Sequence, residues 1–238
     1  MRQVVFDLET TGFKYAEGHR IVEIGAVELI NGAITGRSFH AYVNPERDMP
    51  EDAYRVHGIS AEFLADKPRF AEPEAAPAFL GFIGQAELVA HNGASFDLPF
   101  LQAELKGAGI APLKNTMVDT LHLARRKFPG APASLDALCA RFGIDTKERE
   151  RDGHGALLDS RLLAEVYIEL TGGAQAGLNF TRHDAASDGN GDGASQSRAA
   201  RPRPAPLASR ATEEELAAHA AFLEEMEDAA LWRRYLDA

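Results

Sequence analysis

The strongest constraint on the fold is a short apolar strand that ends in two closely spaced carboxylates. Val4 to Phe6 predict a buried strand, and Asp7 and Glu9 follow it two residues apart. Side chains alternate faces along a strand, so both carboxylates point to the same side. Two like charges placed together repel each other and lose hydration, which is unfavourable unless a cation lies between them. The pair therefore predicts a divalent-metal site. Taken by themselves, however, these two residues are explained equally well by an exposed pair in a turn.

Length and composition indicate a globular protein with room for one full-sized domain and further segments. The chain has 238 residues, of which 45% are hydrophobic. No apolar run reaches the roughly 18 residues of a membrane-spanning helix, and the first strand begins too early to leave room for a signal peptide. The single cysteine, Cys139, stands at helical spacing from Leu135 and Leu138, so we expect it in the core. These features fit a reducing cytoplasm and no membrane partner.

The charge is acidic and unevenly distributed. A formal net charge of −11 argues against a protein that holds nucleic acid by bulk electrostatics. The balance is −7 over residues 1–180, +2 over 181–211 and −6 over 212–238. A nucleic-acid substrate would therefore need metal ions or a partner protein to hold it.

Residues 1–173 have the pattern of one compact α/β domain. Strands come first, joined by short turns such as Asn31-Gly32 that favour antiparallel neighbours. Helices and strands then alternate, which indicates a mixed sheet with helices packed on its faces. The predicted strands are 3–8, 21–29, 38–43, 88–90 and 117–118, and the predicted helices are 73–83, 98–106, 120–127, 135–142 and 154 to about 172.

The segment 181–211 predicts a flexible linker, and residues 212–238 predict a helix. The linker has almost no large apolar side chains, so it cannot bury enough surface to offset its ordering entropy. Its alternating Asp and Gly hint at a calcium loop, but the bidentate Glu that should follow is absent. Thr212 and Glu215 have the spacing of a capping box at the start of the helix. A single helix behind a linker has no core of its own, so its apolar face needs a partner.

Further acidic and histidine residues accompany the first pair. Asp97 follows a predicted strand, His154 and Asp159 lie five residues apart, and Asp52 and His57 lie in the segment 50–59. A set of carboxylates without cysteine suits a hard, oxygen-preferring ion. Mg²⁺ or Mn²⁺ is therefore favoured over zinc.

The order and surroundings of these residues resemble the DEDD superfamily of exonucleases, in its histidine variant. The segment Phe6–Gly12, then Asp97, then His154 with Asp159 match its three motifs, over nearly all of residues 1–172. Within the superfamily the chain most resembles the family of proofreading epsilon subunits of bacterial DNA polymerase III. The segments that carry this narrower resemblance are 134–141, 170–173, 211–219 and 231–233.

The resemblance implies a ribonuclease H-like fold and 3′→5′ hydrolysis at single-stranded DNA ends. The two metal ions that it implies, Mg²⁺ or Mn²⁺, would be held by Asp7, Glu9, Asp97 and Asp159. His154 would take the proton of the attacking water, since a histidine with a pKa of about 6.5 can be neutral and basic at cellular pH. Gly153 and Gly155 would let it swing toward the phosphate. The substrate contacts that the resemblance implies are the metal ligands Asp7, Glu9 and Asp159, the backbone of Thr10, Thr11 and Gly12, and the side chains of His57 and Asp52.

One residue departs from the family pattern. Related exonucleases usually have one residue fewer between the His-Asn pair and the Phe-Asp pair, and Gly93 is the extra residue here. A glycine is the easiest insertion to absorb in a turn. The departure bears on the position of Asp97, while Asp7 is unaffected.

Two further segments resemble partner-binding elements. Gln175, Leu178 and Phe180, within 174–180, resemble the Gln-x-x-Leu-x-Phe peptide that binds the sliding clamp, with a polar anchor and two apolar side chains. Packing of the two apolar side chains back on the domain is the alternative. The helix of 212–238 resembles the end that binds the polymerase (alpha) subunit, and the residues expected to make that contact are Leu216, Leu223 and Trp232.

Two other functions stay open at the level of sequence. A 3′ exoribonuclease would use the same metal site, because phosphodiester hydrolysis alone does not distinguish the sugars. A non-catalytic adaptor between clamp and polymerase would need only the C-terminal segments, although the intact acidic set argues against it. We interpret His19, His40, His122, His183 and His219 as surface or packing residues, and His91 with Asn92 as turn formers.

Overall fold

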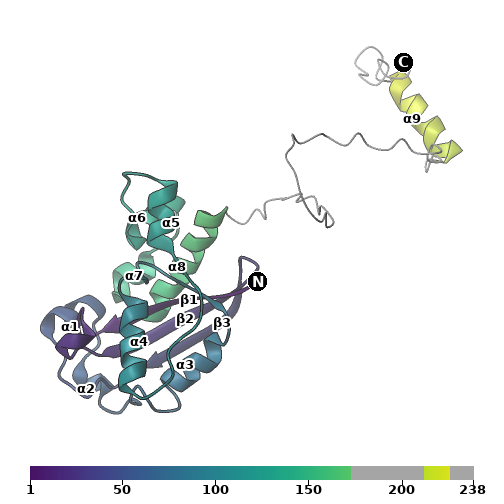
Figure 1. The fold of residues 1–238 in the computed structure, drawn as a ribbon. Coiled ribbons are helices and arrows are strands. Elements are labelled where there is room, and N and C mark those ends of the chain that lie inside the picture. Colours follow the sequence, from purple (N-terminus) through teal and green to yellow (C-terminus); the bar gives the residue numbers. More distant parts are fainter. Residues whose placement is uncertain (173–211, 226–238) are drawn as a thin grey trace, which may run out of the picture. The chain divides into compact units, whose positions relative to one another are not determined.

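The computed structural model describes residues 1–172 and 212–225, which belong to two separate compact units (Figure 1). The predicted clamp-binding residues Gln175, Leu178 and Phe180, the linker 181–211 and Trp232 lie outside the described residues. Among the described residues, no helix is both long and apolar enough to cross a membrane.

Residues 1–172 are built on a mixed five-stranded sheet, as the sequence predicts, and the strand order is β3-β2-β1-β4-β5. β1 pairs antiparallel with β2, which pairs antiparallel with β3, while β1, β4 and β5 run parallel. The strands are β1 (Arg2–Thr10), β2 (Ile21–Ile30), β3 (Ala33–Tyr42), β4 (Glu87–Ala90) and β5 (Met117–Asp119).

The turn between β2 and β3 has the predicted hairpin geometry. Asn31 and Gly32 both have positive φ, at 52° and 78°, which is the backbone conformation of a two-residue hairpin turn. Ile30 consequently pairs directly with Ala33. The prediction that the third strand begins at Ser38 was wrong, because the tight turn starts the pairing at Ala33 even though residues 33–37 are exposed and lack an apolar pattern.

Successive residues of β1 face two different cores. Val4 and Phe6 pack in one cluster with α3 (Ala76–Ile83) and α4 (Asp97–Gly107). Val5 packs in another with Leu163 of α8 (Ala156–Thr171). Because faces alternate along a strand, Asp7 and Glu9 lie on the side of Val5 and α8. The two sequence-predicted carboxylates therefore share the face on which α8 lies.

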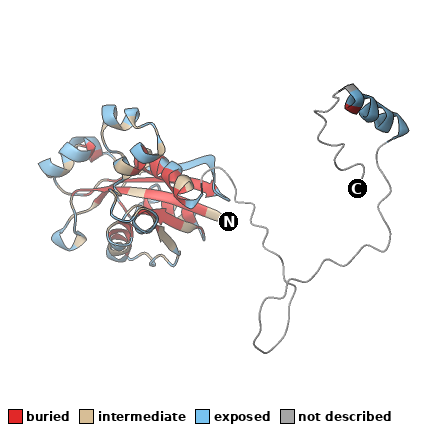
Figure 2. Ribbon diagram, turned by 90° about the horizontal axis from the view of Figure 1, so that it is seen from above, coloured by how far each residue is buried: buried red, intermediate tan, exposed pale blue. Residues whose placement is uncertain are grey.

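The remaining helices complete the layers. α5 (Thr120–Lys127) and α6 (Leu135–Phe142) lie beside α8 (Figure 1). The fully buried Cys139 belongs to the apolar cluster that these three helices share. Ser134 caps α6 through its side chain, and Gly143 ends it in the left-handed region, both as predicted. In Figure 2 the buried residues of this part gather in the sheet and on the helix sides that cover it.

Several short helices escape the sequence prediction. These are η1 (Tyr15–Glu17), α1 (Glu51–His57), α2 (Ala61–Leu64) and α7 (Lys147–Asp152). Helix 73–83 also begins later than predicted, at Ala76. Each missed helix is no longer than two turns, too short to show an apolar repeat, and the segment that forms α7 has no apolar residue at all.

The second described part is α9 (Glu213–Glu225) with the residue that precedes it. The predicted capping box is present, since the Glu215 backbone N–H donates to Thr212 Oγ1 at 3.2 Å and the Thr212 N–H donates to Glu215 Oε2 at 2.8 Å. Leu216 is 52% exposed, whereas Leu223 is buried.

Candidate metal centre

The four predicted acidic residues come together from three elements. Asp7 and Glu9 lie on β1, Asp97 is the first residue of α4, and Asp159 lies in the first turn of α8. Glu9 is 9% exposed, Asp97 3% and Asp159 4%. Ligand atoms of Glu9, His154 and Asp159 all lie within 4.8 Å of one another. Four carboxylates and one imidazole thus meet where the three elements meet.

The crowding of these acids changes their pKa values. Burial, followed by the charges of Asp97, Glu9 and Asp159, raises the pKa of Asp7 well above its ordinary value. Burial and then the charges of Asp159 and Glu23 raise the pKa of Glu9 to about 8, with Arg149 opposing that rise.

Burial also raises the pKa of Asp97 to about 7, although N–H groups of Asp97 and Leu8 stabilise its carboxylate. Buried like charges of this kind are stabilised by a divalent cation, and the donor set of carboxylate oxygens fits Mg²⁺ or Mn²⁺.

The turn before α4 absorbs the extra glycine. Asn92 adopts φ of 60°, and its carbonyl accepts from the N–H groups of Ser95 and Phe96 at 3.1 Å each. The Gly93 carbonyl accepts from Leu98 N–H at 2.9 Å, inside the first turn of α4. A side chain at Gly93 would collide with the Cβ of Ala90. The turn thus holds one more residue than the family pattern and still delivers Asp97 to the acidic cluster.

Two residues of β2 fix the start of α8. Gly25, the partner of Asp7 across the sheet, lets the backbone of Ala156 pass against the strand where an added Cβ would clash with it. Glu23 accepts from Ala156 N–H at 3.1 Å through Oε2, and its Oε1 lies 2.6 Å from His40 Nε2. His40, expected from the sequence to be only a surface or packing residue, therefore orients a buried carboxylate beside the site.

His154 lies just before α8 and is the most exposed member of the centre, with 43% of its side chain accessible. Its Nδ1 lies 3.2 Å from Asp159 Oδ2. Gly153 before it has φ of 83°, which favours glycine, whereas Gly155 after it is extended and caps α8. An exposed imidazole between a left-handed glycine and a helix start is placed to reach a substrate.

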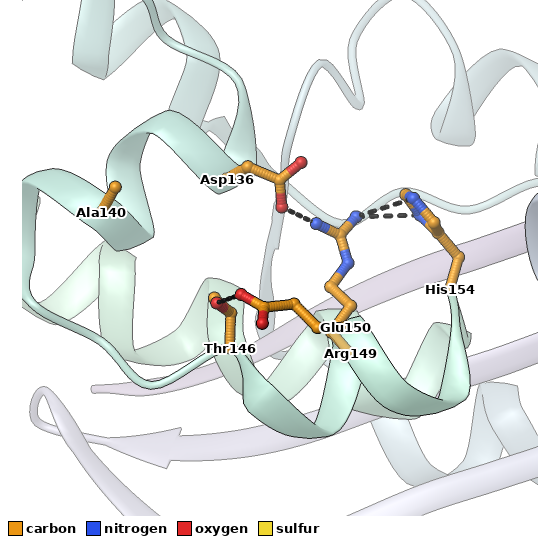
Figure 3. Close-up of a pocket in the computed structure, with 6 residues that line it drawn as sticks. All are labelled: Asp136, Ala140, Thr146, Arg149, Glu150 and His154. Atoms are coloured by element: carbon orange, nitrogen blue, oxygen red, sulfur yellow. Dashed lines mark hydrogen bonds and ion pairs between the residues drawn. The ribbon is translucent and has the colours of Figure 1, made fainter.

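Arg149 is a member of this site that sequence reasoning missed. From α7 its Nη2 donates to Asp159 Oδ2 at 3.0 Å, and its Nε lies 2.7 Å from Oδ1 of the same carboxylate. Nη2 also lies 2.8 Å from His154 Nδ1, and Nη1 contacts Asp136. Figure 3 shows the guanidinium between Asp136 and His154. No signal in the sequence separates Arg149 from the neighbouring charges of the Lys147–Asp152 segment.

A hollow of about 530 Å³ lies next to Glu9. Every residue that the sequence analysis expected at the terminal nucleotide, apart from the ligands Asp7 and Asp159, lines it: Glu9, Thr10, Thr11, Gly12, Asp52 and His57. Phe13, His19 and Phe96 line it too, and they were missed. Phe13 is 85% exposed, and its ring lies 6.4 Å from that of Phe96.

The two α1 residues differ in how they meet this hollow. His57 is buried, and its Nδ1 accepts from Ile59 N–H at 3.0 Å, while its Nε2 is buried without a hydrogen-bond partner among the described residues. Burial lowers the pKa of His57 although the charge of Glu23 opposes this. Asp52 has a side chain 94% exposed and pairs with Arg55 at 3.1 Å. His57 is therefore enclosed by the protein, whereas Asp52 is exposed at the edge of the hollow.

The loop after β1 contacts the side chain of His19. Thr11 Oγ1 lies 3.2 Å from His19 Nδ1 and accepts from Arg20 N–H at 3.0 Å. A Cβ on Gly12 would collide with the His19 ring. Glycine at this position thus allows the ring to lie against the backbone that lines the hollow.

A five-stranded mixed sheet with Asp-x-Glu on its central strand, a third acid at a helix start, and a His-x₄-Asp pair at another helix defines an exonuclease of the DEDD type. The exonuclease family of RNase T matches residues 4–167, and the chain belongs to this family. More narrowly, it groups with the epsilon subunits of DNA polymerase III. The subunit of Escherichia coli K12 is 45% identical over 98% of this chain and 97% of that protein. The subunit of Rickettsia felis is 52% identical over 76% of this chain and 78% of that protein.

Solved structures agree with the fold. Exonuclease X in complex with 5′ overhanging duplex DNA superposes with a TM-score of 0.56 at 27% identity, over 71% of this chain and 90% of that chain. A zinc-bound complex of E. coli exonuclease I with single-stranded DNA reaches 0.60 at 18% identity, over 70% of this chain and 40% of that chain, which supports the fold alone.

Proposed function

We propose that this chain is the proofreading subunit of DNA polymerase III and removes nucleotides from the 3′ end of single-stranded DNA in the cytoplasm. Membership of the epsilon group supports the role, and one observation carries the chemistry. Asp7, Glu9, Asp97 and Asp159 converge with His154 beside a hollow that can take a nucleotide. This is the arrangement that metal-assisted phosphodiester hydrolysis requires.

The four carboxylates would hold two Mg²⁺ or Mn²⁺ ions. Such ions, when bound, activate water and stabilise charge on the phosphate and the leaving 3′ oxygen. The protein's own contribution is to keep the four acids close despite their repulsion, which burial and the packing of α4 and α8 against β1 achieve. Burial is the largest cause of the raised pKa values of Asp7, Glu9 and Asp97, and the charges of neighbouring acids add to it at Asp7 and Glu9.

His154 acts as the general base. Its imidazole is exposed, and Nδ1 lies 3.2 Å from Oδ2 of the proposed metal ligand Asp159, which places the ring beside the reacting centre. The proton of the attacking water would pass to a ring nitrogen that is not engaged by another donor. Gly153 in the left-handed region permits the backbone motion that aims the ring.

The hollow beside Glu9 holds the terminal nucleotide. The backbone of Thr10, Thr11 and Gly12 would lie against it, and the buried His57 would contact it from α1. The exposed Phe13 ring offers a surface on which a base can stack, an interaction that accepts any base. Sequence-tolerant binding is what proofreading requires, since any of the four bases can be misinserted.

The C-terminal segments would bring this acidic chain to DNA. We propose that residues 174–180, through Gln175, Leu178 and Phe180, bind the sliding clamp, and that 181–211 is a flexible linker. The helix 212–238 would bind the alpha subunit through its apolar face, and the residues proposed for that contact are Leu216, Leu223 and Trp232. With a net charge of −11, the chain gains from partners that hold the DNA for it.

Primer digestion tests the proposal. The full chain with Mg²⁺ or Mn²⁺ should shorten a 5′-labelled DNA primer carrying a 3′ mismatch, and Asp7→Ala should abolish the activity while leaving the circular dichroism spectrum unchanged. RNA of the same sequence should be degraded much more slowly. Equal turnover of RNA would favour an exoribonuclease, and no digestion at all would favour an adaptor. Deletion of 212–238 should abolish binding to the alpha subunit.

A further inference from the structure

The guanidinium of Arg149 lies against the carboxylate of Asp159, one of the proposed metal ligands. Nη2 donates to Oδ2 at 3.0 Å, and Nε lies 2.7 Å from Oδ1 without making a hydrogen bond to it. Both side chains are nearly buried, at 9% and 6% exposure, so solvent screens this ion pair only weakly. A divalent ion bound by Asp159 would lie beside this guanidinium, so the two cations compete for one carboxylate.

The same guanidinium also engages the base. Nη2 lies 2.8 Å from His154 Nδ1, and an arginine can only donate a hydrogen bond. The lone pair on Nδ1 is therefore directed at Arg149. In this arrangement a metal ligand and the lone pair of the general base are both engaged by one side chain.

Arg149 has an anchor outside the acidic cluster and space into which it can move. Nη1 contacts Asp136 of α6, whose side chain is 69% exposed. A hollow of about 410 Å³ beside the guanidinium is lined by Asp136, Ala140, Thr146, Arg149, Glu150 and His154 (Figure 3). Glu150 faces this hollow, and its Oε1 accepts a hydrogen bond from Thr146 Oγ1 at 3.0 Å. Asp136 therefore helps to hold the guanidinium on Asp159, and the hollow gives it room to move away.

We propose that Arg149 is a latch that competes with the divalent ion for Asp159, and that metal binding moves its guanidinium away from Asp159 and His154. The inference rests on the proposed metal site. It adds that α7, through Arg149, controls how tightly the proposed site binds the divalent ion. The alternative is that Arg149 stays in contact with Asp159 when the ion binds. In that case Arg149 would hold the Asp159 carboxylate in position and favour metal binding.

Titration calorimetry of Mn²⁺ into the full-length protein, freed of metal by a chelator, separates the two. If Arg149 acts as this latch, Arg149→Gln should bind Mn²⁺ about tenfold more tightly than the wild type, the order expected when one nearly buried charge-assisted contact no longer competes. Lys147→Gln is the matched control, since it removes one positive charge from the same helix, where Lys147 is 85% exposed and pairs with Asp145. It should change the affinity less than twofold.

Asp136→Asn distinguishes the latch from a general charge effect. Removal of an acid near a cation site ordinarily weakens cation binding, although at an exposed position that effect is small. If Asp136 holds the guanidinium in place, its loss loosens Arg149, and Mn²⁺ should bind more tightly. The substitution alters an exposed side chain, so the fold is retained even if Arg149→Gln proves unstable.

The outcomes separate the failure of the latch from the failure of the metal site. Unchanged or weaker Mn²⁺ binding in Arg149→Gln, with measurable binding in the wild type, overturns the latch and leaves the proposed function standing. Tighter binding in Arg149→Gln but not in Asp136→Asn assigns the effect to net charge and overturns the latch as well. If neither the wild type nor Arg149→Gln binds Mn²⁺, the metal site and the latch both fail.

Discussion

Adding one methyl group at Gly25 is expected to disable the centre without touching any of its ligands. Gly25 pairs with Asp7 across the sheet, and α8 begins directly above it. A Cβ at this position would lie closer than 3.0 Å to backbone atoms of Ala156 and Leu157. The nearest of them, the carbonyl carbon of Ala156, would lie at 2.1 Å. Carbon atoms in contact normally stand about 3.5 to 4.0 Å apart, so α8 must move outward by more than about 1 Å.

The magnitude follows from that displacement. Overpacking of a close contact costs about 1 to 3 kcal/mol of stability. Asp159 lies in the first turn of α8, and His154 lies two residues before the helix, so both side chains move with α8. A misplacement of about 1 Å at a catalytic centre lowers the rate about 10²-fold. We therefore expect Gly25→Ala to lose about 2 kcal/mol and about two orders of magnitude in kcat.

The assay pairs urea denaturation with digestion of a mismatched primer. Gly81→Ala is the matched control, because Gly81 lies within α3 and a Cβ there meets no atom within 4 Å. It should leave activity unchanged and stabilise the protein by about 0.5 to 1 kcal/mol through helix propensity. Gly25→Ala with the stability and kcat of the wild type would refute the argument that close packing on this strand positions α8.

Two further predictions concern the acids around the centre. Since the folded-state pKa of Glu9 is raised from 4.5 to about 8, the folded protein binds more protons than the unfolded chain in this window, and metal-free protein should lose stability as pH rises through it. Urea midpoints from pH 4.5 to 8.5 should fall less steeply in Glu9→Gln than in the wild type, and parallel profiles would contradict the assignment. Glu23→Ala removes the acceptor for the first N–H of α8 and should lower kcat about tenfold or more, whereas Glu23→Gln, which keeps an acceptor oxygen, should restore most of it. Equal loss in both variants would point to the charge of Glu23 and its pairing with His40.

The acidic centre was predictable because strand geometry and motif spacing act locally. Two residues apart on β1, Asp7 and Glu9 must share a face, and the structure confirms that this is the face of α8. Asp97 was predicted despite the extra Gly93, and the turn at Asn92 shows how one more residue is absorbed. Capping signals at Ser134 and Thr212 likewise predicted helix starts, because they act within three residues.

Arg149 and Glu23 were not predictable for a common reason. Arg149 stands among alternating charges in a six-residue helix, and only the packing of α7 beside α8 aims it at Asp159. Glu23 lies on a mostly apolar strand, and its partners, His40 and Ala156, are 17 and 133 residues away. Long-range pairs of this kind leave no periodicity in a single sequence.

The amino-acid sequence by itself determined the mixed α/β architecture and singled out the acidic residues that the structure brings together. These follow from alternation along strands, from capping and from the chemistry of side chains, all of which operate over a few residues. Only the tertiary structure decided how closely α8 approaches β2 and which side chains orient the acidic residues. It also decided that the guanidinium of Arg149, on α7, contacts Asp159. Those outcomes depend on backbones meeting across the sheet, where a single absent Cβ at Gly25 sets the distance.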